Sequence, residues 1–239
     1  MRFVTRVVLV HGSVANGEAT WSAQRPLAER WELVVLNRPG FPPGPPVARV
    51  DFEEHAEWLR PQVRPGDHLV GHSYGGVVSM LAAPRAELAS LTLIEPPATR
   101  VALEVPAVRT FAEDAEAWWR DGPSDPRAFL VGFLQRVGST LALPDPLPPW
   151  LEQGARALQL ERGPWEADVP LAALRAAPYP KLVVSGAHSA AFDAICDVLE
   201  RELEADRAVL PGAGHPVQRA PGFSERLEAF LSFATSRRG

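Results

Sequence analysis

Gly71-His72-Ser73-Tyr74-Gly75-Gly76 is the most informative segment of the sequence, because it joins a short apolar run at 68–70 to an apolar helical run at 77–83. A Gly-x-Ser-x-Gly pattern between a strand and a helix is typical of a nucleophile elbow, a sharp turn that exposes its central serine above the sheet. Gly71 and Gly75 lack Cβ atoms, so strand and helix can approach closely there. The following helix N-terminus favours developing negative charge, which makes Ser73 the candidate nucleophile.

Outward from this turn, short apolar runs alternate with amphipathic segments. Continuous apolar runs that end at turn residues are typical of strands buried on both faces, as in a parallel sheet. The pattern predicts an α/β fold, a mostly parallel doubly wound sheet of about six strands. The expected strands are 7–10, 33–36, 68–70, 91–94, 182–184 and 207–210, and the expected helices between them are 21–30, 52–63, 77–83, 192–203 and 223–233.

The segment 98–177 breaks this alternation, because it contains no convincing strand. Three helices are expected, at 105–120, 126–137 and 149–162, each with proline near its first turn, and the proline-rich run at 144–149 is expected to connect two of them. We therefore expect residues 1–97 and 178–239 to form the α/β core. The segment 98–177 is expected to be an inserted helical cap, a lid over the carboxyl ends of the strands.

Composition excludes several classes of protein. The chain has 239 residues, a formal charge of −5 and a pI near 5.7, which argues against a nucleic-acid-binding face. The lone Cys196 excludes an internal disulfide framework and a cysteine metal cluster. No apolar run has the length of a membrane span, and Met1 is followed almost at once by an apolar strand, which leaves no room for a signal peptide. We expect a soluble cytoplasmic protein without nucleic-acid or membrane partners; the sequence indicates no oligomeric state.

A serine hydroxyl is a poor nucleophile without a base, and His215 is the best candidate. It lies in the glycine-rich loop 211–216, after the last expected strand, from which it can reach across the carboxyl edge of the sheet. His188, in another loop beside that edge, is the reserve base. His72 lies inside the elbow and is expected to point away from Ser73.

A second loop is suited to stabilise an oxyanion. His11-Gly12-Ser13 follows the first strong strand, and backbone N–H groups there can face Ser73. The Tyr74 N–H would complete an oxyanion hole with that of Ser13. Each such donor contributes roughly 3–4 kcal/mol to the stabilisation of a tetrahedral oxyanion.

With the His-Gly turn, the elbow and the late Gly214-His215 loop in this order, the chain resembles the α/β-hydrolase fold family, in its lid-bearing branch of small serine hydrolases and esterases. The resemblance covers nearly the whole chain, although 98–177 matches only as a variable cap. Two strands that often begin larger members are missing. The family order of catalytic residues is serine, acid, histidine.

The acid departs from the common family pattern. Members usually carry aspartate just after the penultimate strand, where this chain has Ser189, and the first aspartate, Asp193, comes four residues later inside an expected helix. Glu95 directly follows the strand after the elbow helix, a position that some lipases of the family use. A buried carboxylate there needs a partner, which His215 would supply. We favour Glu95; Asp193, Asp197 or no acid remain alternatives, and Glu95 could instead cap a helix or pair with a cap arginine.

The resemblance implies a serine hydrolase in which Ser73 forms an acyl-enzyme with His215 as base and Glu95 orienting the imidazole. No cofactor or metal is expected, since the sequence lacks H-E-x-x-H, C-x-x-C, a Walker lysine and G-x-G-x-x-G. Some cap aromatics facing the cleft would favour a small or medium, largely apolar carboxylic ester as the hydrophobic small-molecule substrate. The alternatives are thioester, lactone, amide or carbon–carbon bond hydrolysis, or a non-catalytic small-molecule receptor. The cap aromatics are Phe111, Trp118, Trp119, Phe129, Phe133, Trp150 and Trp165.

Overall fold

The computed structural model describes residues 5–139 and 141–237, and its centre is one sheet of six parallel strands. The strand order is β2-β1-β3-β4-β5-β6, so the chain runs outward from β1 to β2 and then returns to the other side of β1. This reversal places the carboxyl ends of β1 and β3 side by side, where open α/β sheets bind their ligands. The predicted fold class is confirmed. The strands are β1 (Arg6–Val10), β2 (Glu32–Leu36), β3 (His68–His72), β4 (Ser90–Ile94), β5 (Lys181–Ser185) and β6 (Asp206–Val209).

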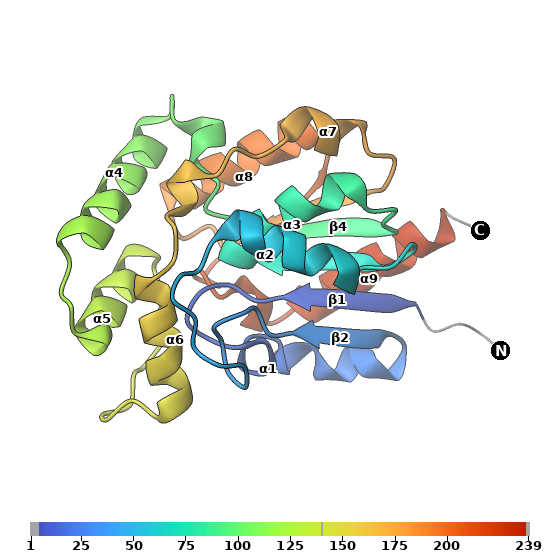
Figure 1. Cartoon of the computed structure of the whole chain (residues 1–239). Coiled ribbons are helices and arrows are strands. Elements are labelled where there is room, and N and C mark those ends of the chain that lie inside the picture. The colour runs from blue at the N-terminus through green and yellow to red at the C-terminus, as the bar shows by residue number, and fades with distance from the viewer. Residues whose placement is uncertain (1–4, 140, 238–239) are drawn as a thin grey trace.

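Helices cover both faces of this sheet (Figure 1). Val8 and Val10 of β1 belong to the apolar cluster shared with α2 (Phe52–Leu59), α3 (Tyr74–Ala82) and α8 (Ala190–Leu203). The alternate residues Val7 and Leu9 belong to a second cluster, which includes α9 (Phe223–Ser236). This two-residue alternation explains why the strands read as continuous apolar runs in the sequence.

Two expected helices differ from the structure, in both cases near a proline. Residues 21–30 were expected to form one helix, but the chain instead forms the short α1 (Gly17–Thr20) and a 3-10 helix at Ser22–Glu29 that contains Pro26. The helix expected at 52–63 ends as α2 at Leu59, and a 3-10 turn with Pro61 follows it. Proline has no N–H to donate and its ring crowds the preceding turn, so neither segment continues as an α-helix.

Between β4 and β5 the described residues contain the helices α4 (Pro106–Asp121), α5 (Pro126–Arg136), α6 (Pro149–Gln159) and the unexpected short α7 (Leu171–Ala176), joined by loops and 3-10 turns. The first three begin with proline, whose missing N–H would be unpaired at a helix start in any case. Figure 1 shows α4, α5 and α6 beyond the arrowheads of the strands, with both termini at the opposite end. The boundaries of a cap domain stay a prediction.

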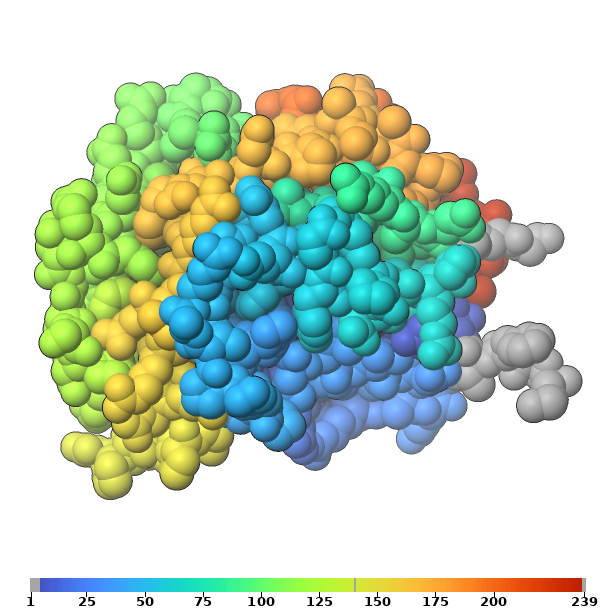
Figure 2. Space-filling view, viewed as in Figure 1, coloured from blue at the N-terminus to red at the C-terminus, as the bar shows by residue number. Residues whose placement is uncertain are grey.

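The chain that follows α6 lies between α4–α5 and the amino-terminal part of the core, as the golden spheres of Figure 2 show. Helices α5 and α6 have a small core of their own, into which Val14 of the β1–α1 loop inserts. Gly154 of α6 approaches this loop so closely that a Cβ would overlap the Val14 carbonyl oxygen. Among the described residues, none of the helices has the combination of length and apolarity needed to cross a bilayer.

Candidate active site

Ser73 lies at the tip of the turn from β3 to α3, with a φ of +52°, a backbone region that residues other than glycine rarely adopt. The flanking glycines allow this turn. A Cβ on Gly71 would lie 2.5 Å from the Ser79 hydroxyl oxygen, and one on Gly75 would overlap the His11 carbonyl oxygen. The predicted elbow glycines are therefore positions where strand, helix and the β1–α1 loop meet without room for a side chain.

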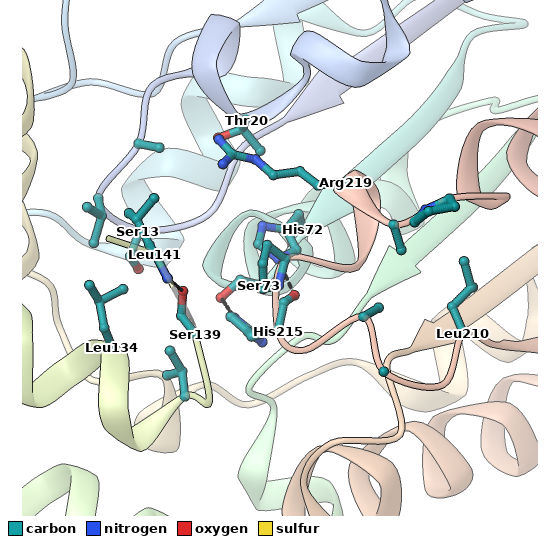
Figure 3. A pocket seen from close by; sticks show the side chains of 18 of the residues that line it. Ser13, Thr20, His72, Ser73, Leu134, Ser139, Leu141, Leu210, His215 and Arg219 are labelled. Carbon is teal, nitrogen blue, oxygen red and sulfur yellow. Dashed lines mark hydrogen bonds between the residues drawn. The ribbon is translucent and has the colours of Figure 1, made fainter. Parts of the chain in front are cut away.

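Three residues from different loops form one line of hydrogen bonds. The Ser73 Oγ lies 2.9 Å from His215 Nε2, as seen in Figure 3, and His215 Nδ1 lies 2.7 Å from Glu95 Oε2. His215 comes from the loop after β6, and its ring stacks on Phe192 of α8 with centroids 4.6 Å apart. The carboxylate accepts a hydrogen bond from the Nδ1–H of His215, so Nε2 carries no proton and can accept a hydrogen bond from the Ser73 hydroxyl.

Glu95 follows β4 directly and is fully buried, with a φ of +42°. Its Oε1 accepts a 2.7 Å bond from the Gly186 backbone N–H, and its Oε2 also receives the His188 Nε2 at 2.8 Å. Burial by itself would raise the pKa of Glu95, but the hydrogen bonds from His188, His215 and Gly186 outweigh burial and lower the pKa to about 2. Glu95 is therefore held as a carboxylate.

The alternative acids lie elsewhere. Asp193 is in the first turn of α8 and accepts a 2.9 Å bond from the Ser185 hydroxyl. Asp197 is farther along α8 and lies 3.4 Å from the Arg207 guanidinium. Ser189 occupies the N-cap position of α8. His188, considered as a reserve base, bonds Glu95 through its Nε2 at 2.8 Å.

His72 supports the position of His215 and does not contact Ser73. Its Nε2 donates a 3.1 Å bond to the backbone carbonyl of His215. Burial, reinforced by the nearby His215, lowers the pKa of His72 to about 3, so the imidazole is neutral. The side chain thus helps to hold the loop that carries the candidate base.

The predicted oxyanion loop touches the elbow. A Cβ on Gly12 would lie 2.8 Å from the Cβ of Ser73. The backbone N–H groups of Ser13 and Tyr74 donate no hydrogen bond among the described residues, so both are available to a ligand beside Ser73.

Two hollows open beside Ser73. The larger is a groove of about 890 Å³ that runs from Ser73 and His215 to Arg219 and Arg226 (Figure 3). The smaller is a pocket of about 30 Å³ on the side of α4 and α5. The smaller pocket is mainly apolar, and its wall includes the aromatic rings of Phe111, Trp119, Phe133, Trp165 and Phe192.

A buried ion pair next to this pocket was not predicted. Arg38, after β2, bonds Glu161, after α6, at 2.9 Å, and both side chains are almost completely buried. Burial raises the pKa of Glu161, and the Arg38 guanidinium and the Ser13 hydroxyl oppose that rise. A signal for Arg38 does exist, since this charged residue follows the apolar run 33–36 after Asn37. Glu161 was expected inside the helix at 149–162, but that helix ends as α6 at Gln159.

Glu95, His188 and His215 also have the composition of a metal site, since their ligand atoms lie within 4.8 Å of one another. The hydrogen bonds of 2.7 and 2.8 Å that both histidines make to one carboxylate oxygen account for this cluster without an ion.

Comparison with known proteins agrees with the fold. The model of the alpha/beta hydrolase family matches residues 7–229, so the chain belongs to this family. A search of curated proteins finds no match.

Solved structures share the architecture at low sequence identity. MenH from S. aureus is 16% identical with a TM-score of 0.73, over 97% of this chain and 94% of that one. A membrane phospholipase A, described as a bacterial virulence factor, is 22% identical with a TM-score of 0.73, over 98% and 81%. Carboxylesterase CesB from Bacillus subtilis is 16% identical with a TM-score of 0.66, over 97% and 85%. At these identities the likeness is one of fold.

Proposed function

We propose that this chain is a serine hydrolase that cleaves a carboxylic ester through an acyl-enzyme on Ser73. The observation that carries the proposal is the continuous line from the Ser73 hydroxyl through His215 to Glu95, with distances of 2.9 and 2.7 Å. Esterases among the solved structures of the same fold agree with it.

The mechanism follows from the proton positions in this line. His215 Nε2 takes the proton of Ser73 Oγ while the oxygen attacks the ester carbonyl, and the resulting imidazolium is stabilised by Glu95. The carbonyl oxygen becomes an oxyanion, which the N–H groups of Ser13 and Tyr74 stabilise. His215 then gives the proton to the leaving alcohol. Water hydrolyses the acyl-enzyme by the same steps, with His215 removing a proton from the water.

The two hollows suggest how the substrate is divided. A pocket of about 30 Å³ holds only a few atoms, and its aromatic wall suits a small apolar group. The groove of about 890 Å³ has room for the larger half of the ester. We propose a small or medium ester with at least one compact apolar half. The cytoplasmic location stays a prediction.

The test is hydrolysis of p-nitrophenyl esters from acetate to octanoate, together with labelling by a fluorophosphonate. We expect Ser73→Ala to lose turnover and labelling, and Glu95→Gln to lower kcat by about 100-fold or more because the imidazolium loses its counter-charge.

Asp193→Asn is the matched control, because it neutralises a nearby carboxylate that bonds Ser185 and not His215. We expect it to keep at least about a third of the wild-type kcat. Turnover that survives in Ser73→Ala would disprove the proposal. A larger loss of kcat in Asp193→Asn than in Glu95→Gln would identify Asp193, not Glu95, as the acid. Labelling of Ser73 without turnover of any ester would instead favour another acyl substrate or a receptor.

A further inference from the structure

Arg38 is a fully buried arginine whose hydrogen bonds converge on the predicted oxyanion loop. Its guanidinium lies between the rings of Phe41 and Tyr74, 4.5 and 4.7 Å from their centroids. Its Nε donates to the His11 carbonyl at 3.1 Å and its Nη2 to the Gly12 carbonyl at 2.8 Å. Two consecutive carbonyls of the loop are thus bound by one rigid, planar group.

The Gly12 carbonyl receives a second donor from His11. The Arg38 backbone N–H donates to His11 Nε2 at 2.9 Å, so the ring proton is on Nδ1, which lies 2.7 Å from the Gly12 oxygen. Burial, reinforced by Arg38, lowers the pKa of His11 well below its usual value and keeps this neutral form. In a planar trans peptide the C=O and the following N–H point in opposite directions. Fixing the Gly12 carbonyl on Arg38 therefore also fixes the direction of the Ser13 N–H.

Glu161 completes this arrangement from the segment between β4 and β5. Its Oε1 lies 2.9 Å from Arg38 Nη2 and its Oε2 accepts a 2.5 Å bond from the Ser13 hydroxyl. The backbone around it is anchored to the core as well: the Val50 N–H bonds the Leu160 carbonyl at 3.0 Å, and the Arg162 N–H bonds the Val50 carbonyl at 2.7 Å.

We infer that Arg38 and Glu161 are positioning residues for the oxyanion hole, which set the direction of the Ser13 N–H from behind the loop. The inference rests on the proposed function. The pair binds three polar groups of the loop: the His11 and Gly12 carbonyls bond Arg38, and the Ser13 hydroxyl bonds Glu161. The Ser13 N–H donates no hydrogen bond among the described residues, which leaves it to face the reacting carbonyl.

The test uses Arg38→Lys and Glu161→Gln, with Arg162→Gln as the matched control. Lysine keeps a positive charge for Glu161, but a single ammonium cannot hold three separated acceptors in a plane. Arg162 is the neighbour of Glu161 and also joins this segment to the core, through Asp51 at 3.4 Å, but it makes no bond to the oxyanion loop. Thermal unfolding of each variant shows whether it is folded.

We expect kcat for p-nitrophenyl acetate to fall about 100-fold in Arg38→Lys and about tenfold in Glu161→Gln, with KM within about threefold of wild type. We also expect the preference for an ester over its thionoester to shrink in both variants, because an oxyanion hole distinguishes oxygen from sulfur. In Arg162→Gln, both kcat for p-nitrophenyl acetate and the preference for the ester over the thionoester should stay near the wild-type values. Folded Arg38→Lys with wild-type kcat and an unchanged preference would overturn the inference.

A substrate-free measurement separates this inference from the proposed function. With serine-selective ¹⁵N labelling, the Ser13 amide resonance should move in Arg38→Lys and Glu161→Gln and stay in place in Arg162→Gln. An unmoved Ser13 resonance in Arg38→Lys overturns the inference even if the wild type hydrolyses esters. Lack of turnover and of fluorophosphonate labelling in the wild type would refute the proposed function. The position of the Ser13 amide resonance in the variants would still test the positioning role of Arg38 and Glu161.

Discussion

One carboxylate oxygen of Glu95 accepts hydrogen bonds from two histidines, His188 and His215, which differ in their other contacts. His215 also bonds Ser73, whereas His188 bonds Glu95 and is partly exposed. The hydrogen bond to Glu95 is the main cause that raises the pKa of His188 above its usual 6.5, against the opposing effect of burial. The His188 imidazole is therefore protonated more readily than a free imidazole, because its pKa is raised.

This shift predicts a pH-dependent contribution of His188 to stability. Because its pKa is raised on folding, its contribution is complete below about pH 6.5 and is lost as the pH rises through the folded-state pKa. We expect His188→Gln, which keeps a hydrogen-bond donor but cannot be charged, to lower the free energy of unfolding more at about pH 5.5 than at about pH 9. Urea unfolding of wild type and variant at both pH values measures this difference in the free energy of unfolding. An equal loss at both values would contradict the prediction.

At the scale of elements, α4 and α5 determine the size of the small pocket. Trp119 of α4 packs edge-on against Phe133 and Trp165, so that the three rings together close one wall of the pocket. Removing the indole opens this wall toward α5.

We expect Trp119→Ala to raise kcat/KM for p-nitrophenyl octanoate, relative to that for p-nitrophenyl acetate, by about tenfold or more. The reason is that each substrate methylene placed in an apolar pocket stabilises the transition state by about 1–3 kcal/mol. Trp150→Ala is the control, since Trp150 on α6 is exposed and lines neither hollow. A ratio that stays unchanged in a folded Trp119→Ala would place the acyl chain in the groove.

The elements themselves were predictable from the sequence to within about two residues at each strand end, because buried parallel strands leave continuous apolar runs that turns interrupt. Ser73 was equally local, since its pattern fits within six residues. The bonds from His188 to Glu95 and from Arg38 to Glu161 join residues 93 and 123 positions apart. Pairs so far apart in the chain leave no local pattern in the sequence. The sequence therefore indicates that a buried carboxylate needs a partner, but it does not identify every partner.

At the scale of the whole molecule, the groove differs in charge from the chain around it. The chain carries −5, yet the described lining of the groove includes Arg219 and Arg226 and no carboxylate. The Arg219 guanidinium donates to the Ala19 carbonyl at 2.8 Å, whereas the Arg226 guanidinium has no hydrogen bond or ion pair among the described residues. A cleft lined by one sign of charge attracts the opposite sign.

We therefore expect the acetate ester of 4-hydroxybenzoate to have a kcat/KM about threefold higher than the corresponding carboxamide at low salt, with the advantage falling at high salt. Arg226→Gln should reduce the advantage. Arg109→Gln removes the same charge from an exposed site outside the groove and should leave the advantage intact. Equal rates for the two esters in the wild type would show that the groove arginines do not act on the substrate.

The buried pair of Arg38 and Glu161 has a consequence for how such a chain can evolve or be recombined. One charge belongs to the strand framework and the other to the segment between β4 and β5. A chimera that receives this segment from a relative without an acid at the position of Glu161 would leave a guanidinium uncompensated inside the protein, at a cost of about 3–5 kcal/mol. The segment is therefore not an interchangeable module: grafts that change substrate preference must carry both members of the pair or replace both together.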